Sequence, residues 1–175
     1  ADHSPMVLID RQVSGVDVDS VVIDNFNAAQ ALTTHLLKQG YKRIAGLFGF
    51  ASVTGKERQR GYRAAFEDAG TDIDEDLVIE LPAKAEDGHT AVTRLLESSE
   101  LPEAILTSSG LLANGAFQAI RDKEIPVPGT IAFVTFDESP WTSMTRPAIT
   151  ASGRGGHPGI YTSTGRIWLT PWTTL

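Results

Sequence analysis

The sequence contains no cysteine, which excludes disulfide bonds, thiolate zinc sites and cysteine nucleophiles. Its four histidines are scattered along the chain without the spacing of metal ligands. No apolar run approaches the roughly 20 residues that a membrane-spanning helix needs. The first residues also lack the basic and apolar regions of a signal peptide. We therefore expect no metal, no cofactor and no membrane contact, and a cytoplasmic location is favoured.

Basic residues are also in short supply. The chain has 22 acidic against 15 basic residues and a formal net charge of −7. All of the acidic residues precede residue 151, whereas two arginines follow it. An acidic body repels the phosphate backbone of nucleic acids, so these 175 residues are not expected to bind DNA on their own.

Short apolar runs alternate with helical patterns along most of the chain. This alternation is typical of βαβ units, and it predicts an α/β fold with a mostly parallel sheet. The predicted strands are 5–10, 21–24, 43–49, 77–81, 104–107 and 131–136. The predicted helices are 25–39, 55–69, 87–97 and 111–123, with Asn25 or Asn27 as the N-cap of the first and Ser52 or Thr54 as the N-cap of the second.

Two of the predicted strands end abruptly in small or acidic polar residues. Ser108 and Ser109 follow one of them, and Asp137 follows the other. In an open α/β sheet, ligands bind outside the carboxyl ends of the strands, so these side chains are candidates for holding a small polar ligand. Each has a structural alternative: Ser109 could cap the next helix, and Asp137 could cap a turn. Trp141 could stack on a sugar ring or fill the seam between two lobes.

A basic run at residues 56–63 opens the second predicted helix. Arg58 could bind ligand hydroxyls or a carboxylate through its planar fork, although most of such a run is ordinarily a solvated face. The loop from Gly49 to Lys56 is similar to a phosphate-binding loop, but its glycines are one residue further apart and Glu57 replaces the required hydroxyl. No G-x-S-x-G motif is present. A binding module is therefore favoured over an enzyme.

Several motifs together resemble the effector-binding domain of the lac repressor family of bacterial transcription regulators. The resemblance covers roughly residues 5 to 150, and the motifs agree in order and spacing. They are VLIDR at 7–11, VIDN at 22–25, HLLKQGYKRIAGLFG at 35–49, ERQRGY at 57–62, the serine pair at 108–109 and FDESPW at 136–141.

The resemblance implies a two-lobed, periplasmic-binding-protein-like fold with parallel sheets and a ligand in the cleft between the lobes. It implies that residues 1–49 form a partial, truncated first lobe and residues 50–137 a second lobe. Residues 138–150 would cross back to the first lobe, and residues 151–175 would be an atypical tail. The family's ligand residues correspond to Arg58, Asp137, Ser109 and, as a first-lobe contact, Asn27; Trp141 is a further candidate.

The function implied is that of a small-molecule effector domain, with an effector of the sugar class, in a DNA-binding transcriptional regulator or repressor. Operator DNA would be bound through a headpiece that is not in this chain, and a homodimer or larger assembly is expected. The alternatives are an exported solute-binding protein and, less favoured, a nucleotide-binding enzyme.

The tail has a different composition from the rest of the chain. Residues 151–175 contain no acid, several glycines, and prolines at 158 and 171. They show neither helical nor strand periodicity, whereas the family continues with a strand and a long amphipathic helix. Because glycine and proline disfavour helices, we predict no long helix here. The composition fits a linker, an irregular extension or a segment read in a different frame.

Overall fold

The computed structural model describes residues 24–137, 140–145 and 149–152, together with four short strands at 7–9, 19–21, 159–162 and 165–168. The strands are β1 (Val7–Ile9), β2 (Asp19–Val21), β3 (Ile44–Gly49), β4 (Val78–Leu81), β5 (Ala104–Thr107), β6 (Ala132–Phe136), β7 (Thr150–Ser152), β8 (Gly159–Thr162) and β9 (Gly165–Trp168). The helices are α1 (Asn25–Lys38), α2 (Val53–Asp68), α3 (Ala85–Leu96), α4 (Gly110–Asp122) and α5 (Pro140–Met144), and a 3-10 turn covers Glu75–Leu77.

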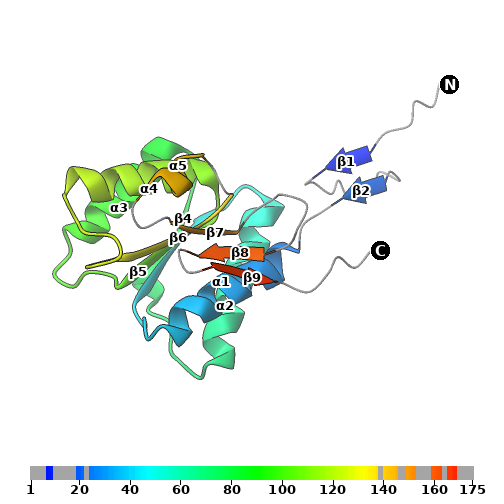
Figure 1. The fold of residues 1–175 in the computed structure, drawn as a ribbon, viewed down its shortest axis with the longest axis horizontal. Coiled ribbons are helices and arrows are strands. Elements are labelled where there is room, and N and C mark those ends of the chain that lie inside the picture. The colour runs from blue at the N-terminus through cyan, green and yellow to red at the C-terminus, as the bar shows by residue number, and fades with distance from the viewer. Residues whose placement is uncertain are drawn as a thin grey trace.

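A seven-stranded sheet in the order β4-β3-β5-β6-β7-β8-β9 forms the centre of the molecule (Figure 1). The first five strands in this order, β4, β3, β5, β6 and β7, are parallel to their neighbours. Strand β8 pairs antiparallel with β7, and β9 pairs antiparallel with β8. Strands β1 and β2 form a separate parallel pair. The predicted α/β class with a parallel sheet is confirmed. The short strands of the tail have no counterpart in the sequence-based expectations, although no helix is described there either.

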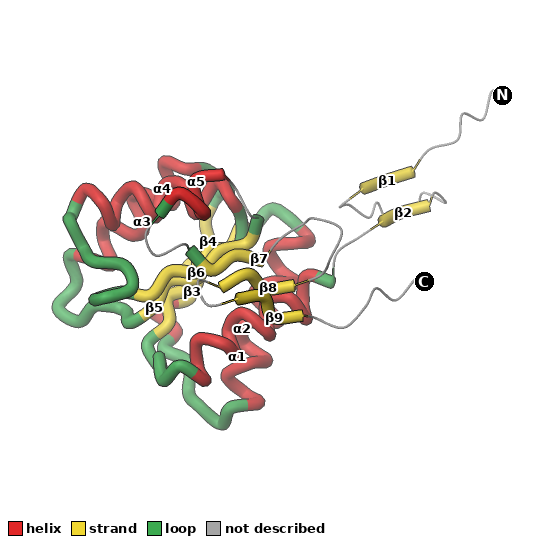
Figure 2. Tube along the Cα trace, in the orientation of Figure 1, coloured by secondary structure: helices red, strands yellow, loops and turns green. Residues whose placement is uncertain are grey.

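Helices cover both faces of this sheet (Figure 2). On one face, α1 and α2 bury apolar residues against β3, β5 and β6, with Leu32, Tyr62 and Phe66 at the centre of the contact. On the other face, α3 and α4 pack Val92 and Leu112 against the same strands. Consecutive residues of a strand point to opposite faces. The three central strands are therefore buried on both sides, which explains their continuous apolar runs.

The two helix pairs approach closely at glycines. A Cβ atom added at Gly61 in α2 would overlap the carbonyl oxygen of Phe26 in α1. One added at Gly115 in α4 would overlap the carbonyl oxygen of Ala85 in α3. In both places the obstacle is backbone, which cannot rotate out of the way. A residue without a side chain is therefore required at each helix crossing.

The helix α1 and the strand β3 belong to the same body as the elements that follow residue 50, whereas the sequence analysis placed them in a separate lobe. That division assigned residues 1–49 to one lobe and 50–137 to another. In the structure, β3 lies between β4 and β5 in a single sheet, and α1 packs on α2. The chain also stays with this sheet after residue 137, because β7 pairs with β6. Burial of a strand on both faces was readable from its sequence, but the identity of its neighbours was not.

Candidate ligand-binding site

The carboxyl ends of β3, β5 and β6 meet at one edge of the sheet, because these strands are parallel. Neighbouring strands β3 and β5 continue into helices on opposite faces: β3 leads to α2, and β5 leads to α4. Such a topological switch point leaves a crevice outside the strand ends, where open α/β sheets bind their ligands. The segments that border it are Gly49–Ser52, Ser108–Gly110 and Asp137.

Arg58 lies at this edge and is only 3% exposed. Its Nε donates to the side-chain oxygen of Asn25 at 2.8 Å, and its Nη1 donates to the carbonyl oxygen of Ser108 at 2.5 Å. The guanidinium carbon lies 4.0 Å from the centre of the Phe136 ring. A buried cation is tolerated only when hydrogen bonds replace its water, and stacking on an aromatic face adds to that stabilisation. The arginine is thus held in one orientation by three separate segments.

The two serines after β5 have different roles. Ser108 is buried, and its Oγ accepts from the backbone N–H of Gly49 at 3.1 Å, which joins the ends of β5 and β3. Ser109 is the N-cap of α4, and its Oγ accepts from the N–H of Leu112 at 3.4 Å. The capping alternative for Ser109 is confirmed. A ligand contact by the same hydroxyl stays a prediction.

Asp137 directly follows β6 and is half-buried. Its φ of 70° lies in the left-handed region, which aspartate and asparagine adopt more readily than other residues with a side chain. Its Oδ2 accepts from the N–H of Gly110, the first residue of α4, at 3.2 Å. The positive end of the helix dipole lies there. The carboxylate is therefore held at the same edge of the sheet as Arg58.

The contacts described for Asn27 and Trp141 are with other residues, namely Asp24 and Phe117. Asn27 is exposed, and its side-chain amide donates to Asp24 Oδ2 at 2.6 Å. The predicted capping by Asn25 or Asn27 is wrong: Asp24 is the N-cap of α1, because its carboxylate accepts from the N–H of Asn27 at 3.0 Å. Trp141 is half-buried and packs against the ring of Phe117, with 5.2 Å between ring centres.

Sequence reasoning missed two partners of Arg58, namely Asn25 and Phe136. It also missed three exposed apolar side chains at this edge: Phe50 after β3, Val53 at the start of α2 and Leu111 in the first turn of α4, which are 48%, 67% and 60% exposed. In the sequence, the available signal was the position of these large apolar residues just after a strand or in the first turn of a helix, beside polar residues. In the loop before α2, Ser52 is the N-cap, and its Oγ accepts from the N–H of Gly55 at 2.9 Å.

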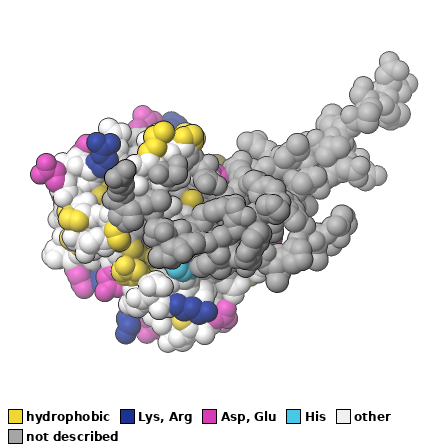
Figure 3. Space-filling view, in the orientation of Figure 1, with side chains coloured by type: hydrophobic (Ala, Val, Ile, Leu, Met, Phe, Trp, Pro, Cys, Tyr) yellow, Lys and Arg dark blue, Asp and Glu magenta, His cyan; other side chains and the backbone are white. Residues whose placement is uncertain are grey.

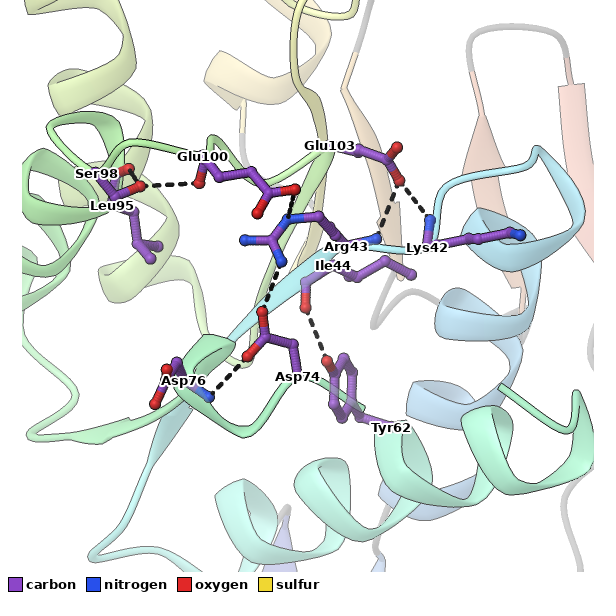
Figure 4. Close-up of polar contacts among 10 residues, drawn as sticks. All are labelled: Lys42, Arg43, Ile44, Tyr62, Asp74, Asp76, Leu95, Ser98, Glu100 and Glu103. Carbon is purple, nitrogen blue, oxygen red and sulfur yellow. Dashed lines mark hydrogen bonds and ion pairs between the residues drawn. The ribbon is translucent and has the colours of Figure 1, made fainter. Parts of the chain in front are cut away.

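The opposite edge of the sheet, where the strands begin, carries an ion network of a different kind (Figure 4). Glu103, just before β5, accepts from the backbone N–H groups of Lys42 and Arg43, at 2.5 and 3.0 Å. These bonds lower the pKa of the Glu103 carboxyl, the one from Lys42 most. Arg43 in turn pairs with Asp74 at 2.7 Å. This network joins the starts of β3 and β5.

Charged side chains are interspersed rather than gathered by sign on the part of the surface that Figure 3 shows for the described residues. Among the residues that the structure describes, no group of histidine, aspartate and glutamate could hold a metal ion. No helix in the described part of the chain is long and apolar enough to cross a membrane.

The parallel sheet and the polar side chains at the carboxyl ends of its strands are typical of α/β domains of the periplasmic-binding-protein type. The sequence matches the family described as periplasmic binding proteins and sugar binding domain of LacI family over residues 1–144. The chain belongs to this family, so the resemblance found from its motifs is confirmed.

Relatives and solved structures agree with this assignment. The chain is 34% identical over 151 residues to the transcriptional regulator DegA of Bacillus subtilis, covering 86% of this chain and 44% of that protein. It is 30% identical to the transcriptional repressor PurR of Haemophilus influenzae, covering 83% and 44%. The structure of the transcription regulator CcpA of Lactococcus lactis is 31% identical, with a TM-score of 0.76 and coverage of 87% and 56%.

A sugar-binding transcriptional regulator of the LacI family from Escherichia coli, complexed with phosphate, is 26% identical, with a TM-score of 0.74 and coverage of 84% and 53%. The chain thus spans about half the length of the relatives that it matches. These relatives are transcriptional regulators, not enzymes.

Proposed function

We propose that this chain provides the effector site of a LacI-family transcriptional regulator and that the effector is a small polar molecule of the sugar class. The proposal rests on one observation above all. Arg58 and Asp137 come from different elements, yet both bind the short segment Ser108–Gly110 at the switch point of the sheet. A cation and a carboxylate are thereby brought to one crevice.

The chemistry of these groups suits a polyol. A guanidinium offers donors in a fixed fork, and a carboxylate offers acceptors, so that together they match the acceptor and donor sides of hydroxyl groups. Ser109 adds a hydroxyl at the same edge. The exposed side chains of Phe50, Val53 and Leu111 supply apolar surface, which fits the apolar face of a sugar ring. Polar anchors combined with apolar walls are the usual composition of small-molecule sites.

The rest of the regulator is part of the same proposal. The body formed by residues 24–152 would be one lobe, and a second lobe, to which β1 and β2 belong, would close over the crevice. Operator DNA would be bound by a headpiece outside these residues, in a homodimer or larger assembly in the cytoplasm. Effector binding would then change DNA affinity through the angle between the lobes, which is a coupling between distinct sites.

Thermal unfolding of the complete regulator with a panel of monosaccharides, disaccharides and sugar phosphates tests this proposal. A ligand at about 100 times its dissociation constant stabilises the folded protein by roughly 2.7 kcal/mol, which raises its melting temperature measurably. We expect the shift to disappear in Arg58→Ala and to persist in Arg60→Ala, which removes an exposed arginine of the same helix. If no compound shifts the wild type, or if both variants respond alike, the proposal fails.

A further inference from the structure

We propose that Thr107 and Thr135 position Asp137 through a chain of two buried hydroxyl groups. This inference rests on the proposed function, in which Asp137 binds the effector. Both threonines are fully buried, and they are register partners in the neighbouring strands β5 and β6. Thr107 Oγ1 donates to Thr135 Oγ1 at 2.9 Å, and Thr135 Oγ1 donates to the carbonyl oxygen of Phe136 at 2.8 Å.

Packing of the sheet does not require a hydroxyl group at either position. The preceding residues of the two strands, Leu106 and Val134, are apolar and buried. Valine has nearly the shape of threonine and carries no polar group that needs a buried partner. Replacing both partners of a buried hydrogen bond by apolar groups of the same shape can be nearly neutral for stability. The hydroxyl pair is therefore better explained by the groups that it holds in place.

The last acceptor of the chain belongs to the peptide group that precedes Asp137. The φ angle of Asp137 describes rotation relative to this peptide plane, and its value of 70° lies in the left-handed region. The hydrogen bond from Thr135 restrains the plane through the Phe136 carbonyl oxygen, whereas the N–H of Gly110 restrains the carboxylate at 3.2 Å. The backbone and the side chain of Asp137 are thus held by separate hydrogen bonds.

The two threonines also come directly before the segments that contact Arg58. Thr107 precedes Ser108, whose carbonyl oxygen accepts from Arg58 Nη1. Thr135 precedes Phe136, whose ring centre lies 4.0 Å from the guanidinium carbon. The bond between the two hydroxyl groups therefore links the strand ends immediately before the residues that form the candidate site.

Amide hydrogen exchange in the 175-residue chain tests the positioning role without an effector. The N–H of Gly110 is the probe, because it donates to the Asp137 carboxylate and loses protection when Asp137 moves. In Thr135→Val its exchange rate should rise by roughly three- to ten-fold, the range for loss of one hydrogen bond. Thr135→Ser, which keeps the hydroxyl group, should restore the wild-type rate.

Thr33→Val is the matched control. Thr33 is fully buried in α1, and its hydroxyl donates to the carbonyl oxygen of Ala29 at 2.9 Å, so this change also removes a buried threonine hydroxyl, but within a helix. We expect Gly110 to exchange at the wild-type rate in this variant. Should Thr135→Val leave the rate unchanged, should Thr135→Ser raise it as valine does, or should Thr33→Val raise it equally, the positioning role is overturned.

If Thr135→Val does not fold, Thr107→Val decides the question, because it removes the bond between the strands and leaves Thr135 in place. Faster exchange of Gly110 in Thr107→Val supports the role, and an unchanged rate refutes it. Because none of these measurements uses an effector, their failure is distinguishable from failure of the proposed function, which is judged by the compound panel alone.

Discussion

For the replacement of Gly61 by alanine, helix propensity predicts a gain in the free energy of unfolding and packing predicts a loss. In the interior of an exposed helix, alanine in place of glycine stabilises by about 1 kcal/mol. At Gly61 the added methyl group would overlap the Phe26 carbonyl oxygen and press on Ala29 and Gln30 of α1. Overpacking typically costs about 1 to 3 kcal/mol, and obstacles made largely of backbone place this case at the upper end. The net expectation is a loss of roughly 1 to 2 kcal/mol.

Urea unfolding followed by circular dichroism measures this change. The transition midpoint should fall while the slope stays constant, since the surface exposed on unfolding is unaltered. Glu67→Ala, an exposed change in the same helix, should alter the free energy of unfolding by no more than about 0.5 kcal/mol. A Gly61→Ala protein as stable as the wild type, or more stable, would show that α1 and α2 are not held at the separation seen here.

Three further results are expected. Ser109→Ala should cost about 1 kcal/mol of unfolding free energy through loss of the α4 cap. Ser99→Ala, at an exposed serine, is the control, and a loss of unfolding free energy at Ser109 smaller than that at Ser99 would refute the capping role. The pKa of Glu103 is lowered in the folded state. Its stabilising contribution is therefore present above its unfolded pKa and is lost as pH falls through the folded pKa. The difference in unfolding free energy between wild type and Glu103→Gln should shrink on acidification, and a difference that stays constant with pH would contradict this expectation. Asp137→Ala in the complete regulator should weaken effector binding by about 1 to 3 kcal/mol, and unchanged affinity in calorimetry would remove Asp137 from the site.

Local patterns in the sequence predicted the elements better than their assembly. The continuous apolar runs of β3, β5 and β6 identified buried strands, and Ser109 was recognisable as a helix cap, because both depend on neighbouring residues. The assignment of β3 to a different lobe from β4 was not supported by the sheet, since burial of a strand does not reveal its partners. The short strands of the tail, each no more than four residues long, offered too little alternation to detect.

In the candidate site, too, the sequence indicated residues from their local context but not the contacts between distant segments. Arg58 and Asp137 were predicted as ligand residues from their positions at the start of a helix and the end of a strand and from the family resemblance. The structure places both at one edge of the sheet, and their contact with a ligand stays a prediction. Asn25 was considered only as a cap, because its contact with Arg58 joins residues far apart in the sequence. Asn27 was favoured in its place, yet it lies two residues further along α1, on the exposed side of the helix. A difference of two positions turns a side chain by roughly half a turn.

The left-handed backbone at Asp137 has a consequence for how such a site can change during evolution. Most residues with a side chain would lose roughly 1 to 2 kcal/mol in this conformation, whereas aspartate, asparagine and glycine adopt it routinely. Substitutions tolerated there are thereby restricted to an anion, a neutral amide or no side chain at all. An exchange of aspartate for asparagine would cost little in folding, and in the proposed effector site it would replace the anion at the end of β6 by a neutral amide.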